Sequence, residues 1–321
     1  MTEPASNPRD TIQALIDQLN TVVLGQEAVV EQFVIGLLAG GHIMVEGVPG
    51  LAKTLLAQCL AASIGGEFSR IQFTPDLMPA DITGHAMYDM KAERFRLRRG
   101  PVFCNILLAD EINRAPAKTQ AALLEVMQEK RVTIEGKPLP VPEPFMVLAT
   151  QNPIEHEGTY QLPEAQLDRF ILKVLIDYPA AEQEVAIALG QSSQADDLVS
   201  SAATLAPILT TEALLALKAA ARAIDIDQEI ANWAVGLVRA TRDWPGLAIG
   251  AGPRASIALL RVGQASAMLA GRDFVIPDDI KPHAIACLRH RVVLTPDTQM
   301  EGLTADHLLA ELIESQPAPR Q

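Results

Sequence analysis

The chain has 321 residues, of which 49% are hydrophobic and 20% are charged, and its formal net charge is −13 at pH 7. This length accommodates two domains with a hydrophobic core each, and the composition is that of an ordinary globular protein. The acidic balance argues against a nucleic-acid motor, because binding a phosphate backbone requires clustered lysine and arginine.

Cysteine and histidine usage indicates a protein of the cytoplasm without a metal site of its own. Cys59, Cys104 and Cys287 form no Cys-x-x-Cys pair, so we interpret them as core thiols in a reducing compartment. The six histidines have no metal-ligand spacing. No apolar run is long enough to span a membrane, and residues 1–10 lack a secretory signal pattern. We therefore expect cytoplasmic localisation and no membrane insertion.

The predicted elements begin with two helices, over residues 11–20 and 26–38, where apolar residues recur at helical spacing. Apolar runs then predict five strands at residues 42–46, 68–73, 103–109, 145–150 and 171–176, and helical stretches such as 55–64 separate several of them. This alternation predicts an α/β fold in which helices cover both faces of a parallel sheet. Ligands of such sheets bind beyond the carboxyl ends of the strands.

The segment between the first predicted strand and the helix at residue 55 has the layout of a phosphate-binding loop. Gly47 and Gly50 allow the backbone to curl so that successive amides can face a polyphosphate. Lys53 would reach the β- and γ-phosphates, and the Thr54 hydroxyl would bind Mg²⁺. Ala52 stands where a third glycine is usual. A glycine-rich turn with an incidental lysine is the alternative interpretation.

Two adjacent carboxylates, Asp110 and Glu111, end the third predicted strand. In nucleotide hydrolases an acidic residue at this position holds the Mg²⁺ shell, and a following glutamate polarises the attacking water. Asn152 follows the next strand along the chain, so all three side chains and the loop are expected at one edge of the sheet. A core strand whose acidic end simply meets solvent is the alternative.

The sheet pattern stops near Tyr178, and residues 191–201 have the composition of a linker or loop. Only helical patterns follow, at residues 211–224, 228–241, 253–270 and 277–288, with Pro253 and Pro277 in first-turn positions. We therefore expect a nucleotide-binding α/β domain over residues 1–190 and a smaller all-helical domain over 205–321. The one basic patch, residues 94–99, is interpreted as a solvated strand face or a subunit contact.

Five further segments give the chain a resemblance to the AAA+ ATPases and, within them, to the MoxR family. These are QFTPDLMPADITG at 72–84, GPVF at 100–103, ADEINRAP at 109–116, ATQNP at 149–153 and LPEAQLDRF at 162–170, together with GVPGLAKT at 47–54. Gln161 departs from the proline that is frequent there. The resemblance covers nearly the whole chain. It implies an AAA+ core with a five-stranded parallel sheet and a helical lid that carries GPRAS at 252–256.

The resemblance also implies a role for individual residues. Lys53, Glu111 and Asn152 resemble the phosphate-binding lysine, the catalytic base and the first sensor, and Thr54 and Asp110 resemble the Mg²⁺ ligands. Arg169 resembles an arginine finger that enters a neighbouring subunit's site, although an Asp168–Arg169 ion pair is an alternative. Arg254 resembles the second sensor, acting in its own subunit or in the neighbour. The expected nucleotide-binding residues are Val23, Gly25, Gly47, Val48, Pro49, Gly50, Leu51, Ala52, Lys53 and Thr54. Val23 and Gly25-Gln26 resemble the segment that lies against adenine, and a plain helix-entry turn is the alternative there.

The resemblance implies an ATP hydrolase that requires Mg²⁺ and forms a homo-oligomeric ring, expected to be a hexamer. Hydrolysis would drive remodelling, chaperoning or metal-cofactor maturation of a protein client, with a separate partner that bears a von Willebrand factor A domain. Residues 75–100 resemble the insert in the second helix of this group, and 132–144 the loop before the sensor strand; both would project toward the pore or a partner. An ATPase subunit of a metal chelatase shares the site and is the main alternative. A nucleic-acid motor is disfavoured by charge, and a non-hydrolysing switch by Glu111 and Arg169.

Overall fold

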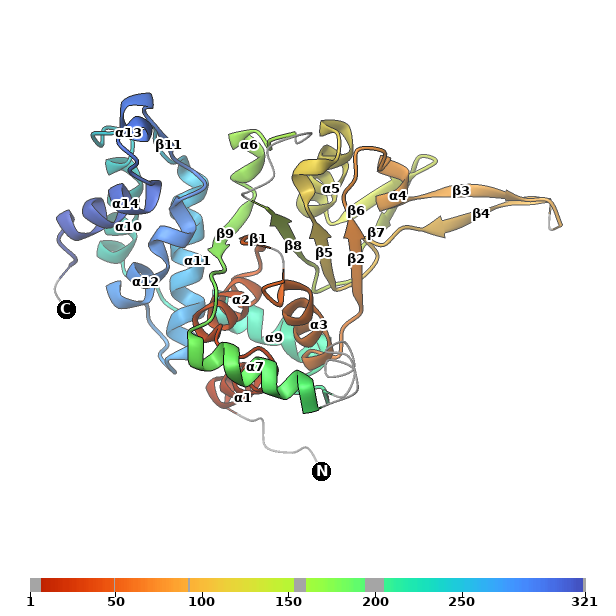
Figure 1. Ribbon diagram of the computed structural model, residues 1–321, viewed down its shortest axis with the longest axis horizontal. Helices are drawn as coiled ribbons and strands as arrows, with labels where there is room; N and C mark the ends of the chain where they lie inside the picture. The colour runs from red at the N-terminus through yellow and green to blue at the C-terminus, as the bar shows by residue number, and fades with distance from the viewer. Residues whose placement is uncertain (1–6, 49, 92, 153–159, 194–204, 320–321) are drawn as a thin grey trace.

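The computed structural model describes residues 7–48, 50–91, 93–152, 160–193 and 205–319. Pro49, which the sequence predicts to bind nucleotide, and much of the predicted linker at 191–201 lie outside the described residues. Figure 1 shows a central sheet with a helical part beside one edge and a long hairpin extending from the other.

The sheet has five parallel strands in the order β2-β5-β8-β1-β9, which confirms the predicted fold class. The strands are β1 (His42–Glu46), β2 (Phe68–Gln72), β5 (Ile106–Asp110), β8 (Met146–Gln151) and β9 (Phe170–Leu175). All residues of β5 are buried, as expected for a strand covered on both faces. Since all strands are parallel, the segments that follow β1, β5 and β8 lie at one edge of the sheet.

Helices cover both faces of the sheet. Along β1, Ile43 and Val45 point into one apolar cluster and Met44 into another, because successive strand residues face opposite sides. The first cluster includes residues of α1 (Pro8–Val22), α2 (Glu27–Ala39) and α3 (Lys53–Ser63), and the second those of α5 (Ala117–Glu129). A further helix, α7 (Ala181–Ser193), follows β9 and was not predicted.

Most of the C-terminal helical part lies beside β9, whereas its first helix lies next to α2 (Figure 1), and the whole part continues the first apolar cluster. It comprises α9 (Thr211–Arg222), α10 (Gln228–Ala240), α11 (Pro253–Leu269), α12 (Pro277–Leu288), α13 (Pro296–Met300) and α14 (Ala305–Ser315). Pro253 and Pro277 occupy the first turns of α11 and α12, where their missing N–H costs nothing. A small antiparallel pair, β10 (Leu247–Ile249) with β11 (Val293–Leu294), accompanies these helices and was not predicted.

Two hairpins occupy the segments predicted to be an insert and a loop. Short α4 (Pro79–Thr83) leads into β3 (Gly84–Asp89) and β4 (Arg94–Arg99), which project beyond β2 (Figure 1). All six residues of β4 are exposed in the single chain, as a solvated strand face or a subunit contact both require. The predicted loop at 132–144 contains β7 (Lys137–Pro140), paired with β6 (Arg131–Ile134). Short helical turns η1 (Ile112–Arg114) and α6 (Glu164–Leu167) complete the described elements.

None of the described helices is both long enough and apolar enough to cross a membrane. Within the same described ranges, no group of three or more histidine, cysteine or acidic side chains is arranged to hold a metal ion.

Candidate nucleotide-binding site

The loop between β1 and α3 is shaped by its glycines. Gly50 has φ +88°, a left-handed conformation that side chains disfavour. A Cβ on Gly47 would lie 2.6 Å from the carbonyl oxygen of Ile176, so only glycine fits that close approach. Ala52, with φ +55° and ψ 17°, also adopts the left-handed conformation, at a cost of roughly 1–2 kcal/mol. The position where a third glycine is usual is therefore one where glycine would relieve strain.

Lys53 is the first residue of α3, and its Nζ donates a hydrogen bond of 2.7 Å to the Gly47 carbonyl. Burial lowers the pKa of this lysine, and the nearby Asp110 and Glu111 partly oppose that shift. The amino end of α3 provides unpaired backbone N–H groups of the kind that bind phosphate. The ammonium group and the helix end thus face the same space as the two carboxylates.

That space is a cavity of about 360 Å³ beyond the carboxyl ends of β1, β5 and β8. The structure brings most of the predicted site together there. The cavity is lined by Gly50, Leu51, Ala52, Lys53, Thr54, Leu55, Gln58, Arg70, Gln72, Asp110, Glu111, Thr150 and Asn152. Gly47 and Val48 line a smaller adjoining cavity of about 140 Å³ with Leu51 and residues 175–178.

Thr150 holds the acidic pair in place. Its hydroxyl donates to Oδ1 of Asp110 at 3.1 Å and accepts from the backbone N–H of Glu111 at 2.9 Å. Glu111 has φ +55° and ψ 50°, a left-handed conformation that is rare for a non-glycine residue and recurs at functional sites. Asn152 is only 8% exposed and lies on the same cavity wall.

Three cavity contacts involve side chains that the sequence did not single out. Arg70 donates from Nε to Oδ2 of Asp110 at 2.7 Å. Gln72 donates to Oε2 of Glu111 at 2.7 Å, and Arg114 pairs with the same oxygen at 3.0 Å. Arg70 and Gln72 lie on the same face of β2, because they are two residues apart. Gln72 is paired with Asp110 of the neighbouring strand β5, and this pairing brings both side chains close to the two acids. That neighbour relation is not visible in the sequence of β2 alone.

Arg169 and Arg254 do not reach this cavity. Both line a second cavity of about 310 Å³ at the amino ends of β1 and β9, which we call the cationic pocket. Arg169 donates from Nη1 to the Leu124 carbonyl at 2.6 Å, while its buried Nε has no hydrogen-bond partner among the described residues. The cationic pocket is lined by residues 40–42, Met127, Gln128, Lys130, Phe145, Asp168, Arg169, Ile171, Lys218, Arg254, Ile257, Ala258, Arg261 and Arg291.

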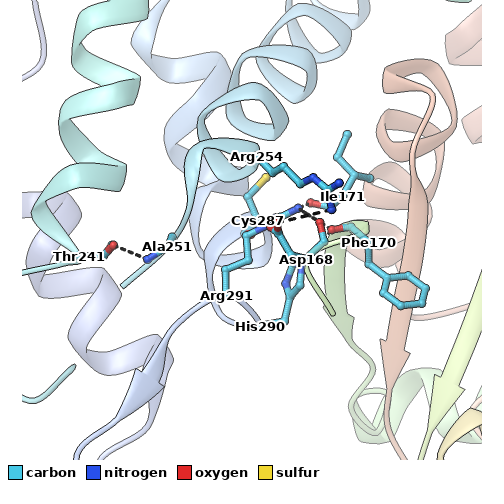
Figure 2. Close-up of polar contacts among 9 residues, drawn as sticks. All are labelled: Asp168, Phe170, Ile171, Thr241, Ala251, Arg254, Cys287, His290 and Arg291. Carbon is cyan, nitrogen blue, oxygen red and sulfur yellow. Dashed lines mark hydrogen bonds and ion pairs between the residues drawn. The ribbon is translucent and has the colours of Figure 1, made fainter. Parts of the chain in front are cut away.

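Asp168 pairs with two arginines of the C-terminal helical part, Arg291 and Arg254 (Figure 2). Its Oδ1 accepts from Nε of Arg291 at 2.8 Å, and its Oδ2 lies 4.0 Å from Nη1 of Arg254. Among the ion pairs of the described residues there is none between Asp168 and Arg169. The structure therefore does not support the alternative of an ion pair between these two neighbours.

Val23 and Gly25 lie outside the cavity at Lys53. Val23 is 2% exposed, and a Cβ on Gly25 would meet Gln183 and Pro179. The next residue, Gln26, donates to the Asp177 carbonyl at 2.8 Å, and Asp177 lines the smaller cavity beside Gly47. Of this predicted segment, Gln26 is therefore the residue that contacts the wall of the smaller cavity.

A parallel sheet of order β2-β5-β8-β1-β9, a phosphate-type loop after β1 and paired acids after β5 define a nucleotide-binding protein of the AAA+ class. Comparison with known proteins agrees. Residues 42–172 match a family model described as "ATPase family associated with various cellular activities (AAA)", and residues 239–312 match one described as "AAA lid domain".

Full-length relatives narrow the class. The chain is 42% identical to Chaperone MoxR1 of Mycobacterium tuberculosis, over 97% of this chain and 83% of that one. It is 30% identical to Protein MoxR of Methylorubrum extorquens, over 97% and 96%. A crystal structure of a candidate ATPase from Cytophaga hutchinsonii superposes with a TM-score of 0.89 at 39% identity, covering 98% and 96% of the two chains. The chain belongs to the MoxR family of AAA+ ATPases.

Proposed function

We propose that the protein hydrolyses Mg²⁺-ATP at sites shared between neighbouring copies in a homo-oligomeric ring, which we expect to be a hexamer, and that hydrolysis remodels a protein client. The observation that carries this proposal is the separation of the two groups of predicted site residues. The acids and Lys53 lie beyond the carboxyl end of β1, whereas Arg169 and Arg254 lie at its amino end.

One half of the site would bind and activate the substrate. Lys53 and the backbone N–H groups of Gly50 to Thr54 would hold the phosphates of ATP, with a charge-assisted contact from the ammonium group. Glu111 would accept the proton of the attacking water, and Asn152 would orient that water and the γ-phosphate through its amide. The common cavity wall formed by these residues supports the assignment.

The donor set at this half fits a magnesium ion. Mg²⁺ prefers oxygen ligands, and the Thr54 hydroxyl and the Asp110 carboxylate line the same cavity. When bound, the ion would neutralise charge on the phosphates. Because Arg70 donates to Oδ2 of Asp110 at 2.7 Å, this arginine and the ion would compete for that carboxylate oxygen.

The other half would come from a neighbouring copy. Five residues of β1 separate the two ends, about 17 Å at roughly 3.3 Å per residue, which is too far for Arg169 to reach the phosphates of its own chain. A guanidinium from the neighbour would stabilise the transferring phosphoryl group and can supply roughly 10³–10⁵ in rate. Since Arg254 lies in the same pocket as Arg169, we assign it to the neighbour's site as well.

The client assignment rests on relatives. The name Chaperone MoxR1 supports a protein client, and we propose remodelling or metal-cofactor maturation with a partner that carries a von Willebrand factor A domain. We place the protein in the cytoplasm, where its three buried free thiols would stay reduced. An ATPase subunit of a metal chelatase remains the alternative, and co-purification with a chelatase catalytic subunit would favour it.

Two variants test the enzymatic part. Glu111→Gln should bind ATP with near-normal affinity but lose turnover by at least about 100-fold, because the amide cannot accept the proton. Lys53→Ala should lose both binding and turnover. Unchanged turnover in Glu111→Gln would contradict the proposed base. For the client, a host strain with Lys53→Ala should lose client activation, and full client activity in that strain would refute remodelling.

A further inference from the structure

The cationic pocket contains more positive charge than the predicted arginines explain. Besides Arg169 and Arg254, its wall includes Lys130, Lys218 and Arg261, and Arg291 lies behind Asp168. Asp168 is the one carboxylate among the residues that line it. This excess is unusual on a chain with a net charge of −13, because interspersed acids would normally compensate it.

Lys218 and Arg261 are the least compensated of these cations. Within the described ranges, neither side chain has a hydrogen bond or an ion pair closer than 4 Å, whereas Lys130 pairs with Glu143 at 3.0 Å. Burial, followed by the charges of Lys130 and Arg222, lowers the pKa of Lys218 to about 8. An arriving anion would therefore stabilise the charged form of this lysine.

Two helices and a glycine-containing turn bring the cationic side chains together in the cationic pocket. Arg254 and Arg261 are seven residues apart on α11, two helical turns, so they share a face. Lys218 extends from α9, and a Cβ on Gly40 would lie 3.3 Å from its Cε. The missing side chain at Gly40 thus leaves room for the lysine beside the amino end of β1.

The phosphate cavity has no such excess of positive charge. The cations that line it are Lys53 and Arg70, and Arg70 is paired with Asp110. The two carboxylates leave little net positive charge for a bound triphosphate. A surface rich in uncompensated cations would complement that site, but the length of β1 prevents the chain's own cationic pocket from reaching it.

We propose that Lys218 and Arg261 contact the phosphates of a nucleotide held by a neighbouring copy of this chain, on the surface that presents Arg169 and Arg254. The ligand class is a nucleoside triphosphate in its Mg²⁺ complex. This inference rests on the proposed shared site. It adds two phosphate-binding residues to that site, Lys218 from α9 and Arg261 from α11.

The test uses the double variant Lys218→Met/Arg261→Gln in the full chain. Methionine keeps the length of the lysine side chain and glutamine keeps a polar group in place of the arginine, and both substitutions remove the positive charge. Thermal unfolding of the variant verifies that it is folded. Turnover should fall about tenfold or more with a raised KM for ATP, because two charge-assisted contacts are lost. The matched control is Lys118→Met/Arg239→Gln, two exposed cations outside both cavities, which should retain wild-type turnover.

Mixing separates a trans role from a cis role. Lys53→Ala subunits have a damaged phosphate loop but an intact cationic pocket. Mixed equally with the double variant, they should form hybrid sites at about one quarter of random subunit contacts and restore activity accordingly. Absence of recovery, or turnover equal to that of the control variant, would overturn the proposal. Loss of ring assembly in mass photometry would also overturn it and assign the two residues to subunit packing.

The outcomes distinguish this inference from the shared-site proposal itself. Recovery in a mixture of Lys53→Ala with Arg169→Ala, together with normal turnover of the double variant, would retain the shared site and reject only Lys218 and Arg261. A free anion is tested with sodium tripolyphosphate. The test measures tripolyphosphate binding to dilute, monomeric Lys53→Ala, with and without the substitutions Lys218→Met and Arg261→Gln. Binding that these two substitutions abolish would assign the pocket to free polyphosphate and overturn the nucleotide assignment.

Discussion

Asp168 and Arg291 join the sheet to the lid through a partly buried ion pair, with Nε of Arg291 2.8 Å from Oδ1 of Asp168 (Figure 2). The Arg291 side chain is only 3% exposed and also donates to the carbonyls of Phe170, at 2.6 Å, and Cys287. This arginine follows α12, while Asp168 directly precedes Arg169. The pair therefore fixes the segment that carries Arg169 against the helices that carry Arg254.

Removing the carboxylate should destabilise the fold. Asp168→Ala deletes a hydrogen bond to a buried guanidinium, so the free energy of unfolding should drop by about 1.5–3 kcal/mol in urea titrations. Arg254→Ala is the matched control. Its pair with Asp168 spans 4.0 Å and its side chain is 54% exposed, so its loss should cost at most about 0.5 kcal/mol. Equal losses in the two variants would contradict this view of the contact.

Arg70 should compete with Mg²⁺ for Asp110. Arg70→Ala frees the carboxylate oxygen that now accepts its Nε, so the concentration of Mg²⁺ needed for half-maximal nucleotide binding should fall several-fold. Titration of a fluorescent ATP analogue at a series of Mg²⁺ concentrations measures this. Arg131→Ala, which breaks the surface pair with Glu129, is the control. An unchanged or higher Mg²⁺ requirement in Arg70→Ala would rule out competition.

His42 should make stability fall on acidification. Its Nδ1 accepts from the N–H of Val147 at 3.0 Å, and its Nε2 lies 3.1 Å from the Met127 carbonyl, so the neutral ring with a proton on Nε2 satisfies both contacts. Burial lowers its pKa from 6.5 to about 4. Between those values the unfolded chain binds more protons, so stability is complete above pH 6.5 and declines as the pH falls toward 4.

This decline has a limit of about 1.4 kcal/mol per pH unit for one histidine. His290 adds to it, because burial and the charge of Arg291 lower its pKa as well. Urea unfolding between pH 7.5 and 5 should give a smaller slope for His42→Gln than for the parent chain. Identical slopes would show that protonation of His42 is not coupled to unfolding.

Local patterns predicted the sheet and the phosphate loop. All five strands were expected within about three residues of their observed bounds, since each is an apolar run between turns. Residues 47–54, Asp110 and Glu111 could be singled out as candidates because the loop and the strand end are each contiguous in sequence. The order of the strands has no such local signal, so Arg70 and Gln72 on β2 were missed although they contact both acids.

The relation between the two pockets also depends on tertiary structure. Arg254 was identified by its motif, but its place beside Arg169 follows only from the packing of α11 against α2 and α12. Lys218 lies on an amphipathic helix and has no sequence feature that separates it from an ordinary surface lysine. The short strands of β10 and β11, three and two residues long, are below the length that alternation can reveal.

The most direct test of the shared site is ATP turnover per subunit across a range of protein concentrations, measured in parallel for Arg169→Ala. A site completed by a neighbouring copy predicts turnover that rises steeply with concentration in the parent chain and is lost in the variant. Turnover that is independent of concentration and unaffected by the variant would mean that each chain holds a complete site, which would contradict the account.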